Sequence, residues 1–130
     1  MDIQSVEWND DLKSFETSLI ITTSAKKFVF KASASSIDDY FEITILNSKT
    51  FEDAYEIPIG ATISSIKDYG KSGCKIDLPH WVTQCPGINY PVEFTFGDSP
   101  DGAVGFIVLM YYDNFTGYLD HELTFETIEL

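Results

Sequence analysis

Residues 40–46 read Tyr-Phe-Glu-Ile-Thr-Ile-Leu, and this short stretch decides the fold class. Phe41, Ile43 and Ile45 fall on one side of an extended chain, while the glutamate and the threonine between them fall on the other. Alternation with a period of two is typical of a strand that has one face in a core and one face near water. The stretch is therefore predicted to be a half-buried strand.

The same alternation recurs in residues 91–96 and 122–127. The inward side chains are Val92, Phe94 and Phe96 in the first stretch and Leu123, Phe125 and Thr127 in the second. Residues 104–112 are instead mostly apolar on both faces, which predicts a central strand covered on both sides. Weaker strand predictions fall on 18–23, 27–32, 61–67 and 74–78, the first two joined as a hairpin across 24–26.

Helical patterns are short and few. In residues 48–55, Phe51, Ala54 and Tyr55 share one side at helical spacing, and residues 10–16 form a second candidate with Asn9 as its N-cap. Turn residues separate the strands at short intervals. We therefore expect one all-β domain over residues 1–130, a mostly antiparallel β-sandwich or jelly roll of about eight strands with one or two short helices.

The charge is unevenly distributed. The chain has 130 residues and a formal net charge of −13. Residues 1–75 contain 12 acidic side chains and all 8 lysines, whereas residues 76–130 contain 9 acidic side chains and no lysine, and arginine is absent throughout. Such a chain does not bind nucleic acid phosphates or an anionic membrane by charge, because both require lysine and arginine. Its C-terminal half favours a cationic partner, a bound metal ion or simple solubility.

The leading functional expectation is a non-enzymatic acidic binding protein. Its C-terminal half would dock on a basic surface of a partner protein, as an inhibitor or immunity protein does when it covers the basic cleft of a nuclease. Glycine-rich phosphate loops, nucleophile elbows and paired-histidine metal motifs are not found in the sequence, so we expect neither catalysis nor a cofactor. The candidate partner-binding residues are Asp98, Asp101, Asp113, Asp120, Glu122, Tyr112 and Tyr118.

The alternative is a ligand-binding β-sandwich. Trp81, Tyr90, Tyr111 and Phe115 lie in the same lysine-free half, and exposed rings beside carboxylates stack on carbohydrate or on the head groups of neutral lipids. Calcium bound by the acidic loops would assist such a site, although Asx-turns are the ordinary interpretation of these aspartates.

A zinc site is a weaker alternative. Cys74, Asp77, His80 and Cys85 offer suitable donors, but their spacing lacks the paired ligands of structural zinc sites. The N-terminal residues do not form a basic and then apolar leader, and residues 104–112 are too few to cross a bilayer as a helix. The expected location is therefore cytoplasmic, with secretion by a signal-less route as the alternative.

Overall fold

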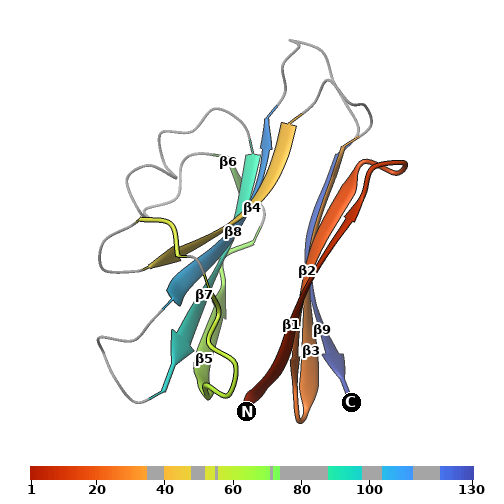
Figure 1. Cartoon of the computed structure of the whole chain (residues 1–130). Helices are drawn as coiled ribbons and strands as arrows, with labels where there is room; N and C mark the ends of the chain where they lie inside the picture. The colour runs from red at the N-terminus through yellow and green to blue at the C-terminus, as the bar shows by residue number, and fades with distance from the viewer. Residues whose placement is uncertain are drawn as a thin grey trace.

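The computed structural model describes residues 1–34, 40–47, 52–54, 56–70, 72–73, 88–97, 104–112 and 121–130. Within these ranges every regular element is a strand, and the strands form two antiparallel sheets that pack face to face (Figure 1). The four-stranded sheet has the order β1 (Ile3–Asp11), β2 (Glu16–Thr23), β3 (Lys26–Ala34) and β9 (His121–Glu129). The five-stranded sheet has the order β4 (Tyr40–Asn47), β8 (Val104–Tyr112), β7 (Ile88–Phe96) and β5 (Ile63–Asp68), with β6 (Ser72–Gly73) also paired to β7. The prediction of an all-β sandwich is confirmed.

Phenylalanine rings hold the two sheets together. Phe94 on β7 lies 5.7 Å from Phe28 and 5.7 Å from Phe30 on β3, measured between ring centroids, and 6.4 Å from Phe125 on β9. Phe28, Phe30 and Phe94 are fully buried. Since these rings come from both sheets, they form the centre of the core, and each aromatic pair adds about 0.5–1.5 kcal/mol beyond the area that it buries.

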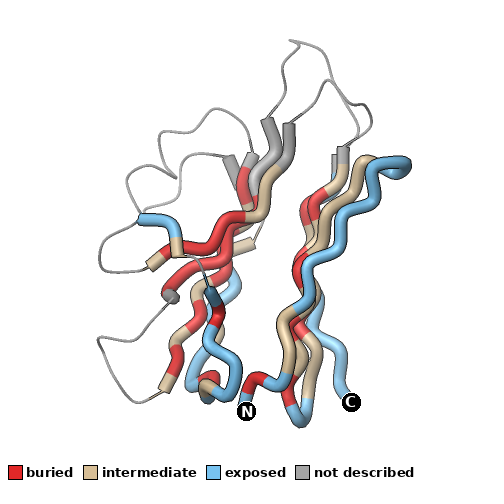
Figure 2. Tube along the Cα trace, viewed as in Figure 1, coloured by how far each residue is buried: buried red, intermediate tan, exposed pale blue. Residues whose placement is uncertain are grey.

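The central strand predicted from residues 104–112 is β8, which lies between β4 and β7. Ile107 and Leu109 belong to the core between the sheets, while Phe106 and Val108 point to the opposite face and are buried as well. The strand is therefore covered on both sides, as its unbroken apolar sequence predicts. Figure 2 shows that burial is concentrated in β4, β7 and β8, whereas β1 and the end of β9 are largely exposed.

The helix predicted over residues 10–16 is wrong. Residues 3–11 form β1, a four-residue turn follows, and β2 begins at Glu16. The Asp11 carboxylate accepts hydrogen bonds from the backbone N–H groups of Lys13 and Ser14, at 2.9 and 3.4 Å, and Phe15 adopts a φ of 52° to close the turn. Asp11 therefore forms an Asx-turn between two strands, and Asn9, the predicted N-cap, lies within β1.

A β-bulge explains why β1 was not predicted as a strand from the alternation of apolar residues. The register with β2 shifts between Ile3 and Ser5, so one residue of β1 is extra. Ile3 and Val6 both contact the core although their positions differ by three, an odd number. A bulge of this kind breaks the period of two on which strand prediction relies.

The helix predicted over residues 48–55 is wrong where the structure describes it. Residues 52–54 are extended and pair with the edge of β4 through two backbone hydrogen bonds, in which Asn47 N–H donates to Glu52 and Ala54 N–H donates to Ile45. Pairing with the open edge of β4 gives these backbone N–H groups hydrogen-bond acceptors. A single helical turn would leave most of its own backbone N–H and C=O groups without partners. Residues 48–51 and 55 lie outside the described residues, as does the predicted strand over 74–78.

The ends of the two sheets are joined at the N-terminus. Ile3 N–H donates to the Ala61 carbonyl at 2.9 Å, and Gly60 N–H donates to the Ile3 carbonyl at 2.8 Å. Ile57, from the segment before this contact, is buried in the core. The segment therefore closes the sandwich on the side between β1 and the five-stranded sheet.

Candidate functional site

The structure describes only part of the predicted docking surface. Asp98, Asp101, Asp113, Tyr118 and Asp120 lie outside the described residues, and Tyr112 is the last residue of β8. Glu122 is described, and it is exposed near the start of β9.

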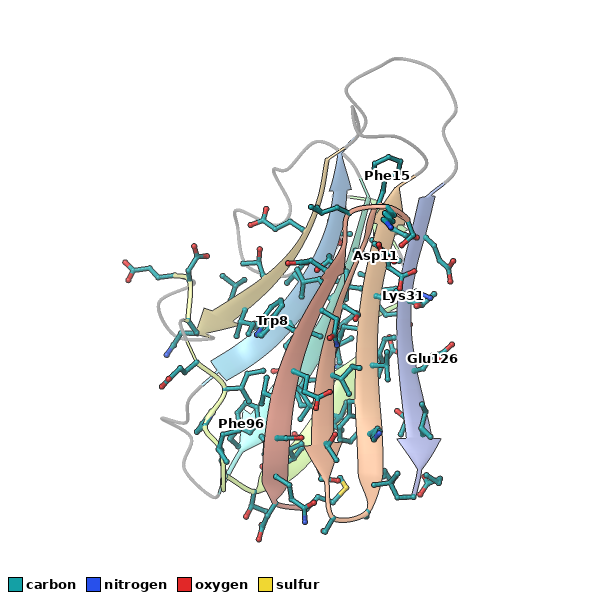
Figure 3. All side chains as sticks on the ribbon, turned by 45° about the vertical axis from the view of Figure 1, so that its right-hand side comes forward. Trp8, Asp11, Phe15, Lys31, Phe96 and Glu126 are labelled. Carbon is teal, nitrogen blue, oxygen red and sulfur yellow. The ribbon has the colours of Figure 1, made fainter. Side chains whose placement is uncertain are left out.

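Glu122 belongs to a larger group of carboxylates on the outer face of the four-stranded sheet. The cross-strand register places Glu7, Ile20, Val29 and Glu126 in one row across β1, β2, β3 and β9. Ile20 and Val29 are partly buried in the middle of this row, and the two glutamates are exposed at its ends. Figure 3 shows Glu126 pointing away from the other sheet.

A parallel row across the same face carries further acidic side chains. It consists of Asp11, Glu16, Ser33 and Glu122. We call the outer face of the four-stranded sheet, with Glu7, Asp11, Glu16, Glu122 and Glu126, the acidic face.

Two lysines of β3, Lys27 and Lys31, also lie on the acidic face. Lys31 forms a salt bridge with Glu16, with a distance of 3.2 Å between Nζ and Oε2. Ion pairs of exposed side chains contribute about 0–1 kcal/mol, so this pair does little for stability. It does neutralise one of the carboxylates, and the negative charge that is left lies along the two edge strands.

A groove opens between the edges of the two sheets. It encloses about 330 Å³ and is lined by Trp8 of β1, by four consecutive residues of β4 from Glu42 to Ile45, and by Asp53 and Ala54. The Trp8 side of the groove belongs to an edge strand, and Trp8 is 50% exposed. In Figure 3, Trp8 lies on the side of β1 that faces the five-stranded sheet.

Thr44 is the unusual member of this lining. Alternation along β4 predicts a half-exposed polar face for Thr44, yet the residue is only 8% exposed. Its neighbours on that face, Leu46 and Val108, are buried too, so this face of the sheet is covered and the sequence-based prediction of a polar face is wrong here. The Thr44 hydroxyl has no hydrogen-bond partner within the part of the chain that the structure describes. A buried hydroxyl without a partner costs about 1–3 kcal/mol.

A second polar cluster joins β5 and β7. The Tyr90 hydroxyl donates to Asp68 and the Tyr69 hydroxyl donates to Glu93, each at 3.1 Å, and the Lys67 ammonium lies 4.9 Å from the centre of the Tyr69 ring. Burial raises the pKa of the Tyr90 hydroxyl, and the hydrogen bond to Asp68 raises it further. The Tyr90 hydroxyl is therefore held protonated while it donates to Asp68. This arrangement suits a structural role for the cluster.

Sequence reasoning did not single out Trp8 or Asp53. Trp8 lies close to Glu7, Asp10 and Asp11 in the sequence. An aromatic residue within such an acidic stretch could have marked Trp8 as a candidate site residue. Asp53 carried no such signal, because its place in the groove depends on the pairing of residues 52–54 with β4.

No group of three or more potential metal ligands occurs among the residues that the structure describes. The acidic loops and the Cys74, Asp77, His80 and Cys85 set lie outside those residues. Within the same ranges, no helix is long and apolar enough to span a membrane.

Comparisons with known proteins give no match. No family model, no curated protein and no solved structure matches the chain. The function is therefore inferred from the geometry and charge of the molecule itself.

Proposed function

We propose that the protein acts by binding, and that its acidic face docks on a basic surface of a partner protein, in the manner of an inhibitor or immunity protein. The observation that carries the proposal is the row that runs from Glu7 through Ile20 and Val29 to Glu126. It combines a partly buried apolar centre with carboxylates at both ends. Protein interfaces have this composition, an apolar centre within a polar rim.

Charge gives this face its specificity. The net charge of −13 attracts a cationic protein from a distance, and carboxylates on the face orient it at contact. Opposed charges raise the association rate more than they raise the final affinity. A partner steered in this way should bind fast at low salt and slower as salt increases, because screening shortens the electrostatic range to about 8 Å at physiological ionic strength.

The test compares two double variants that remove the same charge from different places. Glu122→Gln/Glu126→Gln changes the acidic face, whereas Asp2→Asn/Glu56→Gln changes carboxylates away from it. Asp2 accepts a hydrogen bond from the Thr62 hydroxyl at 2.7 Å, and asparagine keeps the accepting oxygen. The probe is a lysine decapeptide, whose association rate is measured by stopped-flow fluorescence over a series of salt concentrations.

We expect the face variant to associate several-fold more slowly than the wild type and to show a flatter salt dependence, while the control variant changes much less. Equal effects of the two variants would mean that only the total charge matters. That result would reject docking at the acidic face.

A further inference from the structure

We infer that the outer edge of β9 binds an extended basic segment of the partner as an added antiparallel strand. The inference rests on the proposed function, since the segment belongs to the basic partner that docks on the acidic face. Edge strands present rows of unpaired backbone N–H and C=O groups, and an extended peptide can pair with such a row. β9 borders the four-stranded sheet on the side away from β1 (Figure 3), so a strand added there extends the acidic face.

The backbone of β9 alternates between groups that point to β3 and groups that point away from it. Leu130 N–H donates to the Ala25 carbonyl at 3.0 Å, which continues the β3–β9 register by one hydrogen-bonded pair. In an antiparallel ladder such pairs alternate with pairs that are not hydrogen-bonded, and the register of β3 with β9 has no shift. The N–H and C=O groups of Leu123, Phe125 and Thr127 therefore point to the outer edge, where no described strand lies.

The other edges of the two sheets are blocked or interrupted, within the ranges that the structure describes. β1 has the bulge after Ile3, and Ile3 bonds to residues 60 and 61. β4 pairs with residues 52–54, and β5 has a bulge near its start and carries Lys67. Bulges, lysines and covering segments prevent pairing with another chain. β9 has nine residues in unbroken register, with no proline and no lysine, so it is the described edge best suited to receive a strand.

The inner side of the β9 edge is apolar and incompletely covered. The Phe125 ring stacks on Phe30 at a centroid distance of 4.8 Å and packs against the core, yet Phe125 is only partly buried. Leu123, on the same side of the strand, is buried. An apolar side chain opposite Phe125 on an added strand would cover the rest of this ring, and cross-strand pairs of aromatic and β-branched residues are favourable. The added strand therefore has apolar residues on its inner side.

The outer side of the edge selects basic side chains. Glu122 and Glu126 lie on this side and are exposed, and β9 itself carries no lysine. Basic side chains on an added strand lie within cross-strand reach of these carboxylates, whereas acidic side chains are repelled. A second copy of the chain is disfavoured as the occupant, because each copy has a net charge of −13. The segment that fits this edge therefore alternates apolar and basic residues.

The test compares two peptides that have the same charge and composition. The parent probe is a heptapeptide with blocked ends in which lysine and valine alternate. In an antiparallel strand whose valines face inward, the valine N–H groups point to β9 and the lysine N–H groups point to solvent. One variant peptide is N-methylated at the middle valine, and the other is N-methylated at the lysine next to it. Binding to the intact chain is followed by NMR through the backbone amides of β9.

We expect the valine-methylated peptide to bind about tenfold more weakly than the parent, because a backbone hydrogen bond and the close approach of the strands are lost. The lysine-methylated peptide should bind nearly as well as the parent. With the parent bound, hydrogen exchange should slow about tenfold at the amides of Phe125 and Thr127, which the added strand covers. It should change little at Thr124 and Glu126, whose N–H groups point to β3.

Two variants of Thr127 separate the backbone from the side chain. Thr127→Pro removes an N–H that points to the outer edge, so no hydrogen bond to β3 is lost, whereas Thr127→Ala keeps this N–H. We expect the proline variant to bind the parent peptide about tenfold more weakly and the alanine variant to bind it within about twofold of the wild type. Circular dichroism confirms that each variant is folded, and the methylated peptides decide the question if the proline variant is not.

Several outcomes would overturn the inference. Equal binding of the two methylated peptides, or weaker binding of the lysine-methylated one, would exclude the proposed strand pairing. Unchanged exchange at Phe125 would place the peptide elsewhere, and dimerisation of the free chain with slowed exchange at the same amides would make a second copy the occupant.

The inference and the proposed function fail separately, because the two methylated peptides carry the same charge. A difference between these peptides, with no effect of Glu122→Gln/Glu126→Gln on the lysine decapeptide, would reject docking by the acidic face and keep strand addition at β9. The opposite pair of results would reject strand addition and keep the acidic face.

Discussion

Replacement of Thr44 by valine should stabilise the protein. Valine has nearly the shape of threonine, so the packing against Leu46 and Val108 is kept while the unpartnered hydroxyl is removed. The free energy recovered is the cost of burying that hydroxyl, about 1–3 kcal/mol. For a chain of this length, each kcal/mol raises the melting temperature by about 3–6 °C.

Thr23 provides a matched control, because it is also a buried strand threonine but its hydroxyl is fully used. The Thr23 hydroxyl donates to the Lys26 carbonyl at 2.9 Å and accepts from the N–H groups of Lys26 at 2.9 Å and Ala25 at 3.3 Å. Thr23→Val leaves these partners unsatisfied at the turn of the β2–β3 hairpin. It should therefore destabilise the protein by about 1–3 kcal/mol.

The assay is unfolding in urea, followed by circular dichroism and by tryptophan fluorescence. The midpoint should rise for Thr44→Val and fall for Thr23→Val, with an unchanged slope in both cases. A lower midpoint for Thr44→Val, or shifts of the same sign in the two variants, would refute the reasoning that the Thr44 hydroxyl is buried at a cost.

Two further predictions concern the core and the first turn. Phe94→Ala removes the ring that packs against Phe28 at 5.7 Å, so it should lower the free energy of unfolding, measured in urea, by about 3–5 kcal/mol. The control Ile128→Ala, at an exposed position of β9, should change it by less than about 0.5 kcal/mol. Similar small effects of the two variants would contradict the described core. Backbone hydrogen bonds, chiefly from Lys13, hold the pKa of the Asp11 carboxyl below its usual value of 3.8, so its stabilising effect is present above that value and is lost as the pH falls through the folded pKa. The stability difference between wild type and Asp11→Ala in thermal unfolding should therefore shrink from pH 7 to acidic pH, and a difference that does not depend on pH would show that the turn needs no charge.

The sequence alone was enough to predict the strands that have at least one apolar face. Residues 40–46 and 91–96 show the period of two, and they form β4 and β7 with Ile45 and Phe94 in the core. Residues 104–112, with apolar residues on both faces, form the central strand β8. These features follow from the chain itself, because alternating side chains leave an extended backbone on opposite sides.

The acidic face could be predicted only in part. The excess of carboxylates after residue 75 led to the prediction of a docking surface in the C-terminal half. Glu122 was one of the residues predicted to belong to that surface. The contribution of Glu7 and Asp11 from the other end of the chain was not predicted, because β1 was not recognised as a strand. Its bulge between Ile3 and Ser5 hides the alternation.

Only the tertiary structure decided the rest. Residues 52–54 have helical spacing with their neighbours, yet they are extended because the open edge of β4 binds their backbone. Thr44 occupies a polar position in the alternating pattern, yet it is buried beside Leu46 and Val108 on its face of the sheet. The groove joins Trp8 to Thr44 and Asp53, which lie far from Trp8 in the sequence. Periodicity is a property of neighbouring residues, whereas the meeting of two sheet edges depends on the packing of the whole chain, and for that reason the strands could be read from the sequence and the groove could not.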